Sequence, residues 1–463
     1  MQAVYISNAQ IATSREVFEG SLLVRDGKIA AVLRAGETPP DLDGIKVIDA
    51  GGCYLLPGGV DPHTHFDLDV GFTRASDDFY TGTVAAACGG TTTVIDHMAF
   101  GPKGCPLPHQ SAVYHKLAAQ QGPVIDYGFH GVIQHVDDEV LASMKTLRDE
   151  EGLSSFKIYL TYDFKIDDYG VLKVLERANE LGLTICVHCE NDATINTLRA
   201  QYVADGHTEA KYHALSRPAE AEAEAVYRML MLGKIAGEAK VYIVHLSTRL
   251  GLEALRLVRR TGQKNILVET CPQYLFLDDS RYNDPQAGLK YIMSPPLRKQ
   301  PDIDSMWDGL TANDIQTIGT DHCPFFFDTQ KQRGANDFTQ CPNGAPGVEL
   351  RMPLMFSEGF MKGRLSLPQV VDSCCTRPAE IFGIAPQKGI IAPGADADLV
   401  LFDPSVKWTV TKDQLHENVD YTPYEGIELT GRPVWTMARG EVIVDNGVFK
   451  GQKGSGKYLK RNI

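Results

Sequence analysis

Long apolar runs are absent from this sequence of 463 residues, and no stretch of about 18 consecutive apolar residues could span a membrane as a helix. The beginning, MQAVYISNAQ, lacks the basic segment and apolar core of a secretory signal peptide. Internal repeats are also missing, and the only biased segment is the basic tail KGQKGSGKYLKRN. We therefore expect a cytoplasmic, globular protein with no membrane partner.

An excess of basic residues is absent as well. Lys and Arg together number 45 against 59 Asp and Glu, which gives a net charge of −14. Nucleic acids and anionic membranes favour basic surfaces, so neither is an expected partner. The ten cysteines show no disulfide-framework spacing. We interpret them as reduced thiols, and Cys186 as a small strand residue rather than as part of a redox or zinc motif with Cys189.

The character of the sequence changes twice along the chain. Short strand-like runs with glycine turns, such as SLLVRDGKIAAV, fill residues 1–56. Over 57–385, short apolar runs such as SSFKIYL alternate with amphipathic helical segments. About eight such units predict a parallel (β/α)8 barrel, an α/β fold. Strand-like runs return over 386–445, so both chain ends are predicted to form one small β-sandwich domain, and a mobile tail is predicted over 446–463.

Side chains that bind metals stand at the ends of the predicted barrel strands. His63 and His65 lie two residues apart in DPHTHFD, so both imidazoles point to one side of an extended segment. His188, His245 and Asp321 each follow an apolar run. The carboxyl ends of the strands form the active-site face of a barrel. Imidazoles and a carboxylate gathered there predict a zinc site, with manganese, cobalt or nickel as alternatives.

Lys157 is unexpected, because it stands in the middle of the buried strand SSFKIYL. An ammonium group has only donors and cannot bind a metal. Burial lowers the pKa of a lysine, and the neutral amine can then react with carbon dioxide to give a carbamate whose two oxygens can bridge two metal ions. The alternative interpretation is a buried lysine paired with a carboxylate from elsewhere in the chain.

Several short motifs resemble, in this order, those of cyclic amidohydrolases of the dihydropyrimidinase/hydantoinase group. They are GGVDPHTHFD, SSFKIYLTY, VHCEN, IVHLS, ETCPQYL, SPPLR, TDHC and CPNGAPGVE. The resemblance covers nearly the whole chain, including both β-rich ends. DHMAFGPKGC and EGLSSFKIYLTY are most similar to the bacterial D-phenylhydantoinase branch.

The resemblance implies the barrel fold of the amidohydrolase superfamily and a binuclear metal centre in which a hydroxide bridges two divalent ions, zinc before manganese, cobalt or nickel. The residues implied to bind the ions are His63, His65 and Asp321 for one, His188 and His245 for the other, and carbamylated Lys157 (N6-carboxylysine) for both.

The same resemblance implies roles around the substrate. Tyr162 would hydrogen-bond the substrate carbonyl oxygen and stabilise the developing oxyanion. Asp321 would carry the proton of the hydroxide to the leaving nitrogen. Ser294 and Asn343 would hold the ring amides. The residues implied to border the pocket for the exocyclic substituent are Leu68, Val70 and Tyr159.

Neighbouring polar residues are predicted to support these groups, because histidine ligands usually have a second hydrogen-bond partner. The expected supports are His322 and Cys323 beside Asp321, and Glu190 and Asn191 beside His188, while Asp96 and His97 are candidates to line the pocket.

The implied activity is metal-dependent hydrolysis of the cyclic amide bond of 5-substituted hydantoins to N-carbamoyl amino acids, with D selectivity and a preference for aromatic substituents. A dihydropyrimidinase that opens dihydrouracil or dihydrothymine, and an allantoinase, are the alternatives that share these ligands. A dihydroorotase is disfavoured, because Phe66 and Asp67 follow the histidine pair where an arginine would bind the substrate carboxylate, and Asp67 would repel that carboxylate. A non-catalytic dihydropyrimidinase-like protein is disfavoured, since all six ligand positions are present. Relatives are commonly tetramers, so a homotetramer is implied.

Overall fold

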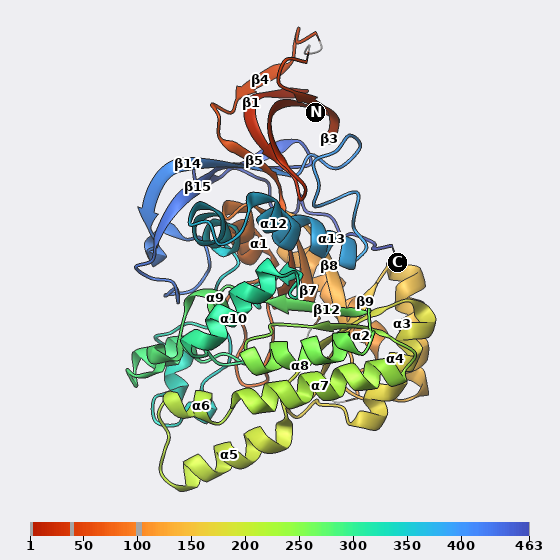
Figure 1. Cartoon of the computed structure of the whole chain (residues 1–463), viewed down its shortest axis with the longest axis vertical. Coiled ribbons are helices and arrows are strands. Elements are labelled where there is room, and N and C mark those ends of the chain that lie inside the picture. The colour runs from red at the N-terminus through yellow and green to blue at the C-terminus, as the bar shows by residue number, and fades with distance from the viewer. Residues whose placement is uncertain (1–2, 38–40, 99–103, 463) are drawn as a thin grey trace.

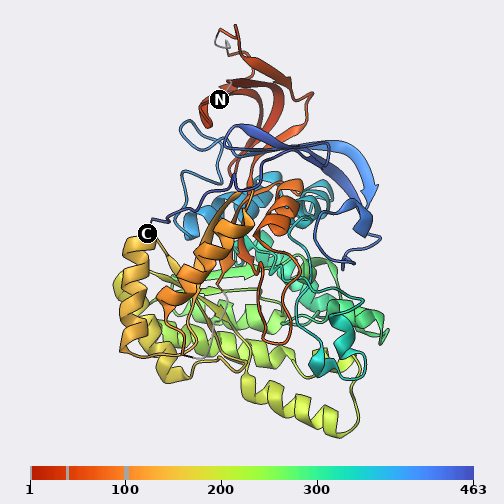
Figure 2. The ribbon, with the colours of Figure 1, turned by 180° about the vertical axis from the view of Figure 1, so that it is seen from behind.

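The chain folds around two sheets, a parallel barrel and a second sheet built from both chain ends (Figure 1). The computed structural model describes residues 3–37, 41–98 and 104–462. Residues 99–103, which belong to the motif DHMAFGPKGC, lie outside the described residues. The terminal sheet lies at one end of the molecule, and helix α5 (Asp192–Ala204) projects from the opposite end in both views (Figures 1 and 2).

The barrel sheet has eight parallel strands that neighbour one another in chain order, which confirms the predicted (β/α)8 architecture. Each strand is short and almost entirely buried, as expected for strands covered by helices. The strands are β6 (Gly59–Thr64), β7 (Thr91–His97), β8 (Asp126–Val132), β9 (Ser155–Tyr159), β10 (Thr184–His188), β11 (Lys240–Ile243), β12 (Ile266–Thr270) and β13 (Thr317–Ile318).

Backbone hydrogen bonds close the barrel between its first strand and the segment that follows its last. The amide of Asp321 donates to the carbonyl of His63 (2.9 Å), and the amide of His65 donates to the carbonyl of His322 (2.9 Å). A parallel bridge joins Thr64 to His322. Closure therefore brings two residues of the DPHTHFD motif beside Asp321, although more than 250 residues separate them in the sequence.

Helices follow the strands and cover the outside of the barrel (Figures 1 and 2). None of the helices within the described residues could cross a membrane, given their length and polarity. The main helices are α1 (Phe79–Cys88), α2 (Leu107–Gln121), α3 (Asp138–Glu151), α4 (Asp168–Leu181), α5, α6 (Lys211–Leu215), α7 (Ala219–Ile235), α8 (Arg249–Arg260), α9 (Gln273–Phe276), α10 (Gln300–Thr311), α11 (Arg351–Leu354), α12 (Leu367–Val371) and α13 (Arg377–Ile381).

Helix α4 illustrates how the sequence sets these boundaries. The Asp167 side chain accepts a hydrogen bond from the amide of Gly170 and caps the amino end. Gly182, at a φ of 71°, ends the helix in the left-handed conformation that glycine adopts readily. Apolar residues spaced three and four apart face the barrel, and they are Val171, Val174, Leu175, Ala178 and Leu181.

The terminal sheet combines strands from both ends of the chain, as the sequence predicts. Its hydrogen-bonded order is β17-β16-β15-β14-β5-β1-β2-β3, and β4 pairs with β1. Neighbours pair antiparallel except for β1 with β4 and β1 with β5. The strands are β1 (Val4–Ala12), β2 (Val17–Arg25), β3 (Lys28–Arg34), β4 (Lys46–Asp49), β5 (Tyr54–Pro57), β14 (Leu399–Thr409), β15 (Glu428–Ala438), β16 (Glu441–Asp445) and β17 (Val448–Phe449).

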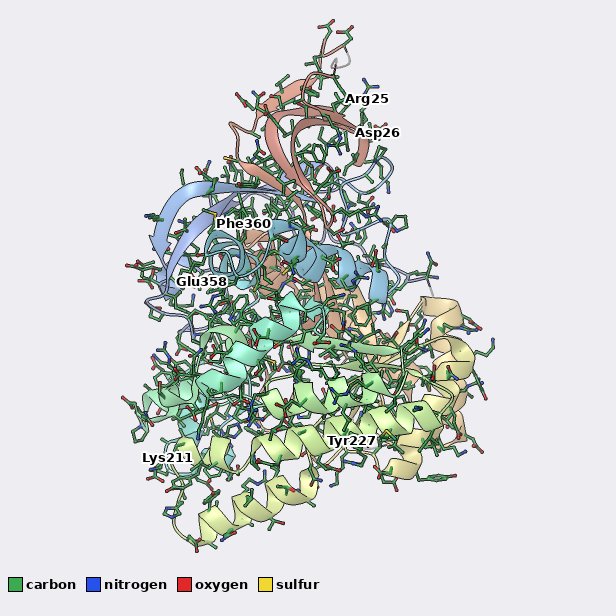
Figure 3. The ribbon with its side chains drawn as sticks, viewed as in Figure 1. Arg25, Asp26, Lys211, Tyr227, Glu358 and Phe360 are labelled. Atoms are coloured by element: carbon green, nitrogen blue, oxygen red, sulfur yellow. The ribbon has the colours of Figure 1, made fainter. Side chains whose placement is uncertain are left out.

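Aromatic and charged contacts fix this sheet to the barrel. Phe360, in the helical segment Met355–Met361, lies beneath the terminal sheet (Figure 3), and its ring centroid is 5.4 Å from that of Tyr54 in β5. Deeper in the junction, the fully buried Lys388 pairs with Asp126 of β8 (2.6 Å) and with Asp398 (2.7 Å). The barrel is thus held rigidly against the terminal sheet on the side away from the cavity described below.

The C-terminal tail is ordered, so the prediction of a mobile tail is wrong. The amide of Leu459 donates to the carbonyl of Tyr127, and the amide of Arg461 donates to the carbonyl of Gly152. Leu459 is buried beside Phe382. The basic composition suggested a solvated tail, but the lysines point outward while alternate residues pack under the barrel.

Replacing Leu459 with alanine should lower the free energy of unfolding by about 2–4 kcal/mol, because the buried side chain is lost and a cavity remains. Chemical denaturation of wild type and variant measures this difference. The neighbouring exposed residue supplies the control, since Lys460→Ala should change the free energy by no more than about 0.5 kcal/mol. Equally small changes in the free energy of unfolding for both substitutions would mean that the tail does not contribute to stability.

Candidate metal centre and substrate pocket

One cavity of about 1000 Å³ opens at the carboxyl ends of the barrel strands. A volume of this size accommodates a small-molecule ligand. The structure brings every residue predicted to bind metal or substrate to its wall, namely His63, His65, Leu68, Val70, Lys157, Tyr159, Tyr162, His188, His245, Ser294, Asp321 and Asn343.

His63, His65 and Asp321 converge on one point. His63 lies in β6, and the other two side chains follow the ends of β6 and β13. The Nε2 atoms of both histidines lie close to the same carboxylate oxygen, Asp321 Oδ1, at 3.1 Å and 3.0 Å. Ligand atoms about 2 Å from a shared ion stand at about this spacing. The three residues therefore form a compact group of donor atoms suited to a divalent metal.

His188 and His245 form a second pair on neighbouring strands. His188 is the last residue of β10, and His245 follows β11. Their ring centroids are 4.6 Å apart, and the ring of His245 is 5.5 Å from that of His63. Glu190 accepts a hydrogen bond from His188 Nε2 at 2.7 Å, as predicted for a residue that orients this histidine. The two groups of histidines thus face each other across the barrel.

Lys157 lies in β9 between these groups and is 1% exposed. Its Nζ is 5.1 Å from the ring centroid of Tyr159, and it forms no ion pair with a carboxylate in the described part of the chain. Burial lowers the pKa of Lys157, although the nearby carboxylate of Asp321 opposes this shift. A buried amine with a lowered pKa fits carbamylation better than it fits a structural ion pair.

Burial and close charges also set the protonation of the other groups. Burial alone would lower the pKa of His63, but Glu269 and Asp321 raise it to about 9. Burial lowers the pKa of His65 to about 4. Burial by itself would raise the pKa of the Asp321 carboxyl. The nearby His63 and His65 outweigh this effect and hold the pKa well below its usual range. Asp321 is therefore ionised at neutral pH and available as a metal ligand and proton acceptor.

Three of the candidate residues adopt a left-handed backbone conformation that is uncommon outside glycine. The φ angles are 76° for Tyr162, 39° for His245 and 54° for Asp321. Such conformations cost about 1–3 kcal/mol each and persist where surrounding contacts impose them. All three follow strand ends that border the cavity, so part of the backbone strain in the described chain lies at the candidate site.

Part of the cavity wall is apolar. Leu68 belongs to a small buried cluster that also contains Phe325, and the half-buried Val70 packs against this cluster. Tyr159 packs edge-on against Phe164, with ring centroids 4.9 Å apart, and both rings line the cavity. These side chains create an apolar region beside the polar centre, as expected for a pocket that holds an apolar substituent.

Glu269 is a central residue that the sequence analysis did not single out. This fully buried carboxylate lies 2.6 Å from His63 Nδ1 and accepts hydrogen bonds from the His245 amide (3.0 Å) and the Tyr242 hydroxyl (2.8 Å). It fixes the ring of His63 and the backbone of His245 at once. The signal was available, because a glutamate ends the apolar run NILVET in the same way as the predicted ligands end theirs.

Lys331 is a second residue that was missed. It is fully buried and donates hydrogen bonds to the carbonyls of Ile292 (2.7 Å) and Pro342 (2.9 Å). These carbonyls stand just before Ser294 and Asn343, so Lys331 joins the two segments that carry the predicted ring-binding residues. It is the first residue of the short 3-10 helix Lys331–Gly334, and the surrounding sequence gave no signal.

The other polar residues predicted around the centre are only partly placed as expected. His322 is fully buried and bonds to Asp77 (3.0 Å), which fixes the segment after β13. Asn191 does not support His188 as predicted, because its side chain caps helix α5 through the amide of Thr194. Asp96, a candidate to line the pocket, is not among the described residues of the cavity wall, and it accepts hydrogen bonds from Thr64 Oγ1 (2.7 Å) and the Phe66 amide (2.9 Å).

His97 and Cys323 lie close to the centre. Cys323 lines the cavity. His97 is buried beneath it, and its ring centroid is 4.4 Å from that of His63 and 4.9 Å from that of His65. His97 therefore packs against the two histidines, and it is not among the described residues that form the cavity wall.

Another group of metal-binding side chain types, Cys88, Glu349 and His416, lies away from the cavity. Glu349 accepts hydrogen bonds from both the amide and Nδ1 of His416, at 2.6 Å and 2.9 Å. Burial raises the pKa of the Cys88 thiol far above neutrality. An internal ion pair explains this group, and a thiolate ligand is disfavoured there.

Comparison with known proteins agrees with the geometry of the barrel and cavity. Residues 54–443 match the Amidohydrolase family. A D-phenylhydantoinase of Escherichia coli O1:K1 / APEC is 49% identical over 458 residues, which cover 99% of this chain and 98% of the relative.

Solved structures give the same result. The crystal structure of dihydropyrimidinase from Brevibacillus agri NCHU1002 has a TM-score of 0.96 and 42% identity, and the match covers 99% of both chains. A crystal structure of a D-hydantoinase has a TM-score of 0.96 and 43% identity over 100% of this chain and 99% of that chain. The chain therefore belongs to the amidohydrolase family, as a cyclic amidohydrolase of the hydantoinase and dihydropyrimidinase group.

Proposed function

We propose that this protein hydrolyses the cyclic amide bond of 5-substituted hydantoins to N-carbamoyl amino acids, with D selectivity and a preference for aromatic substituents. The observation that carries the proposal is the shared cavity, in which four imidazoles, one carboxylate and a buried lysine face Tyr162 and an apolar wall. The similarity to a D-phenylhydantoinase over nearly the full chain supports the choice of substrate.

The donor atoms of the cavity suit two divalent ions, most simply zinc, with manganese, cobalt or nickel as alternatives. Asp321 Oδ1 lies within 3.1 Å of Nε2 of both His63 and His65, as expected for ligands of one ion. His188 and His245 would hold the second ion. Lys157, carbamylated by carbon dioxide, would supply the bridging carboxylate-like group that the charge of two ions requires.

When bound, two such ions lower the pKa of a shared water and polarise the amide carbonyl, so that hydroxide is available at neutral pH. Side chains of the protein carry out the remaining steps. Burial raises the pKa of Tyr162, so its hydroxyl remains protonated and can donate a hydrogen bond to the carbonyl oxygen as negative charge develops there.

Asp321 is suited to transfer a proton, since its carboxylate is ionised at neutral pH and borders the cavity. It would accept the proton of the attacking water oxygen and deliver it to the ring nitrogen as the carbon–nitrogen bond breaks. Ser294 and Asn343 would hold the ring amides, and Leu68, Val70 and Tyr159 would contact the 5-substituent.

Dihydrouracil and allantoin present similar cyclic amides, so their hydrolysis is the competing assignment. The apolar wall formed by Leu68, Val70 and the aromatic rings favours an aromatic substituent over the small groups of dihydropyrimidines. The homotetramer that the family resemblance implies is part of the proposal and awaits a measurement of mass in solution.

A substrate panel tests the proposal. The metal-replete protein should open D-5-phenylhydantoin with a kcat/KM at least about tenfold above that for dihydrouracil, because an apolar contact contributes about 1–3 kcal/mol of discrimination. Unsubstituted hydantoin, allantoin and L-5-phenylhydantoin complete the panel. A preference for dihydrouracil or allantoin would assign the protein to the competing activity, and equal rates for both enantiomers would remove the D selectivity.

A further inference from the structure

Arg217 is a buried cation at the cavity wall that the proposed reaction does not use. It lies in the turn before helix α7, is 4% exposed and borders the cavity. Its guanidinium forms an ion pair with Glu190 Oε2, the oxygen that also bonds to His188 Nε2. The side chain is therefore connected directly to the partner of a candidate metal ligand.

The same guanidinium contacts Tyr162. The Cζ atom of Arg217 lies 5.6 Å from the centroid of the Tyr162 ring, within the range of a cation–π contact. Both side chains line the cavity. The Tyr162 ring is therefore held beside a buried cation.

The surrounding structure holds Arg217 in place. Arg298 donates hydrogen bonds to the carbonyl of Arg217 and to Ser247 Oγ (3.1 Å). Pro218 follows Arg217 and begins α7, which further restricts the turn. By contrast, Tyr162 stands in a strained left-handed conformation after β9, at a φ of 76°. A fixed cation thus contacts a tyrosine whose own backbone conformation is unfavourable.

We propose that Arg217 is a positioning residue that holds Tyr162 in the orientation needed to donate its hydroxyl hydrogen to the substrate carbonyl. The guanidinium packs against the ring, while Glu190 fixes the guanidinium. This inference rests on the proposed function, in which Tyr162 stabilises the developing oxyanion. Arg217 would contribute to the rate only through Tyr162.

A double-mutant cycle tests this dependence, because residues that act through one another have non-additive effects. Tyr162→Phe should lower kcat for D-5-phenylhydantoin by about 10²–10³-fold, the usual effect of removing an oxyanion donor. Arg217→Met should lower kcat by at least about tenfold in the wild-type background, with a smaller change in KM. In the Tyr162→Phe background, the same substitution should cost less than about threefold. Equal losses in both backgrounds would overturn the proposal.

Two further variants separate positioning from other roles. Arg217→Lys keeps the positive charge beside Glu190 but loses the planar fork, so it should retain bound metal and still show most of the loss in kcat. Arg461→Met removes another buried arginine, which bonds to Ser155 and Phe129 beneath the barrel, and its effect should be the same with or without Tyr162. If loss of bound metal accounts for the whole decrease in kcat in Arg217→Met, Arg217 supports the metal centre and does not position Tyr162.

A crystal structure of Arg217→Met gives a readout that does not depend on activity. The Tyr162 side chain should leave its position at the cavity wall, whereas an unchanged Tyr162 would contradict the proposal. If the wild type fails to open any hydantoin, the proposed function fails, but this structural comparison still decides whether Arg217 positions Tyr162.

Discussion

Replacement of Lys157 by alanine is expected to abolish hydrolysis of D-5-phenylhydantoin and to empty the metal centre. The carbamate would supply the anionic bridge between two cations, and without it two like charges face each other with too few ligands. Because bridging metal ions contribute several kcal/mol to the rate, kcat/KM should fall at least about a thousandfold. Metal content measured on the same preparations should fall with it.

A substitution at a second buried lysine shows whether the loss of any buried cation is enough to empty the metal centre. Lys331→Met removes a fully buried ammonium that bonds to two carbonyls, so this variant should keep its metal content. The carbamate itself should appear as a carbon signal after labelling with ¹³C-bicarbonate, and Lys157→Ala should lack this signal. Retained metal and near-normal turnover in Lys157→Ala would refute the bridge.

Replacement of Asp321 by asparagine should lower kcat by about 10²–10⁴-fold, the usual contribution of a positioned general base. Asparagine keeps an oxygen near His63 and His65 but cannot accept a proton. Because the two histidines hold the pKa of Asp321 well below the usual range, the wild-type carboxylate is already ionised at neutral pH. The comparison of kcat, measured across neutral pH with metal content on the same samples, isolates proton transfer from metal binding.

The matched control for this substitution is another aspartate on the cavity wall. Asp192 pairs with the half-exposed Lys165 at 2.9 Å and has no role in the proposed chemistry. Asp192→Asn should change kcat by less than about fivefold, since an exposed ion pair contributes at most about 1 kcal/mol. Equal kcat values for wild type and Asp321→Asn would show that another group moves the proton.

Strand-end residues could be predicted from the sequence because the barrel imposes a simple rule. Each of His188, His245 and Asp321 follows an apolar run, and parallel strands direct such residues to one face. The alternation in SSFKIYL likewise placed Lys157 on the inner side of β9, away from Phe156 and Ile158, which join the outer core. Local patterns were sufficient here, since the strand period determines which side a residue faces.

Other residues of the candidate site are positioned by contacts between distant segments, which local sequence patterns do not encode. Arg217 meets Tyr162 across 55 positions of sequence, and Lys331 reaches carbonyls in two separate loops. The tail was misjudged for the same reason, because its order comes from pairing with Tyr127 and Gly152. The composition of the tail does not indicate the surface of the barrel on which the tail packs.

Asp67, one of the two residues that disfavour a dihydroorotase, lies in an environment that the sequence did not predict. Asp67 was expected to repel a substrate carboxylate, but it pairs with Arg74 at 3.0 Å and bonds to Gln121 at 2.8 Å. It is not one of the described residues that form the cavity wall. Phe66 is fully buried and is not among those wall residues either, so neither of the two residues after the histidine pair offers a cation to a substrate carboxylate.

The central claim is that hydantoin hydrolysis depends on a pair of metal ions held by this set of ligands. The most direct measurement is a titration, in which protein stripped by a chelator regains metal stepwise while the rate of D-5-phenylhydantoin opening is followed. We predict negligible activity without metal and a rise that levels off near about two equivalents of zinc or manganese per chain. Full activity in the stripped protein, or a plateau reached well below one equivalent, would contradict the account.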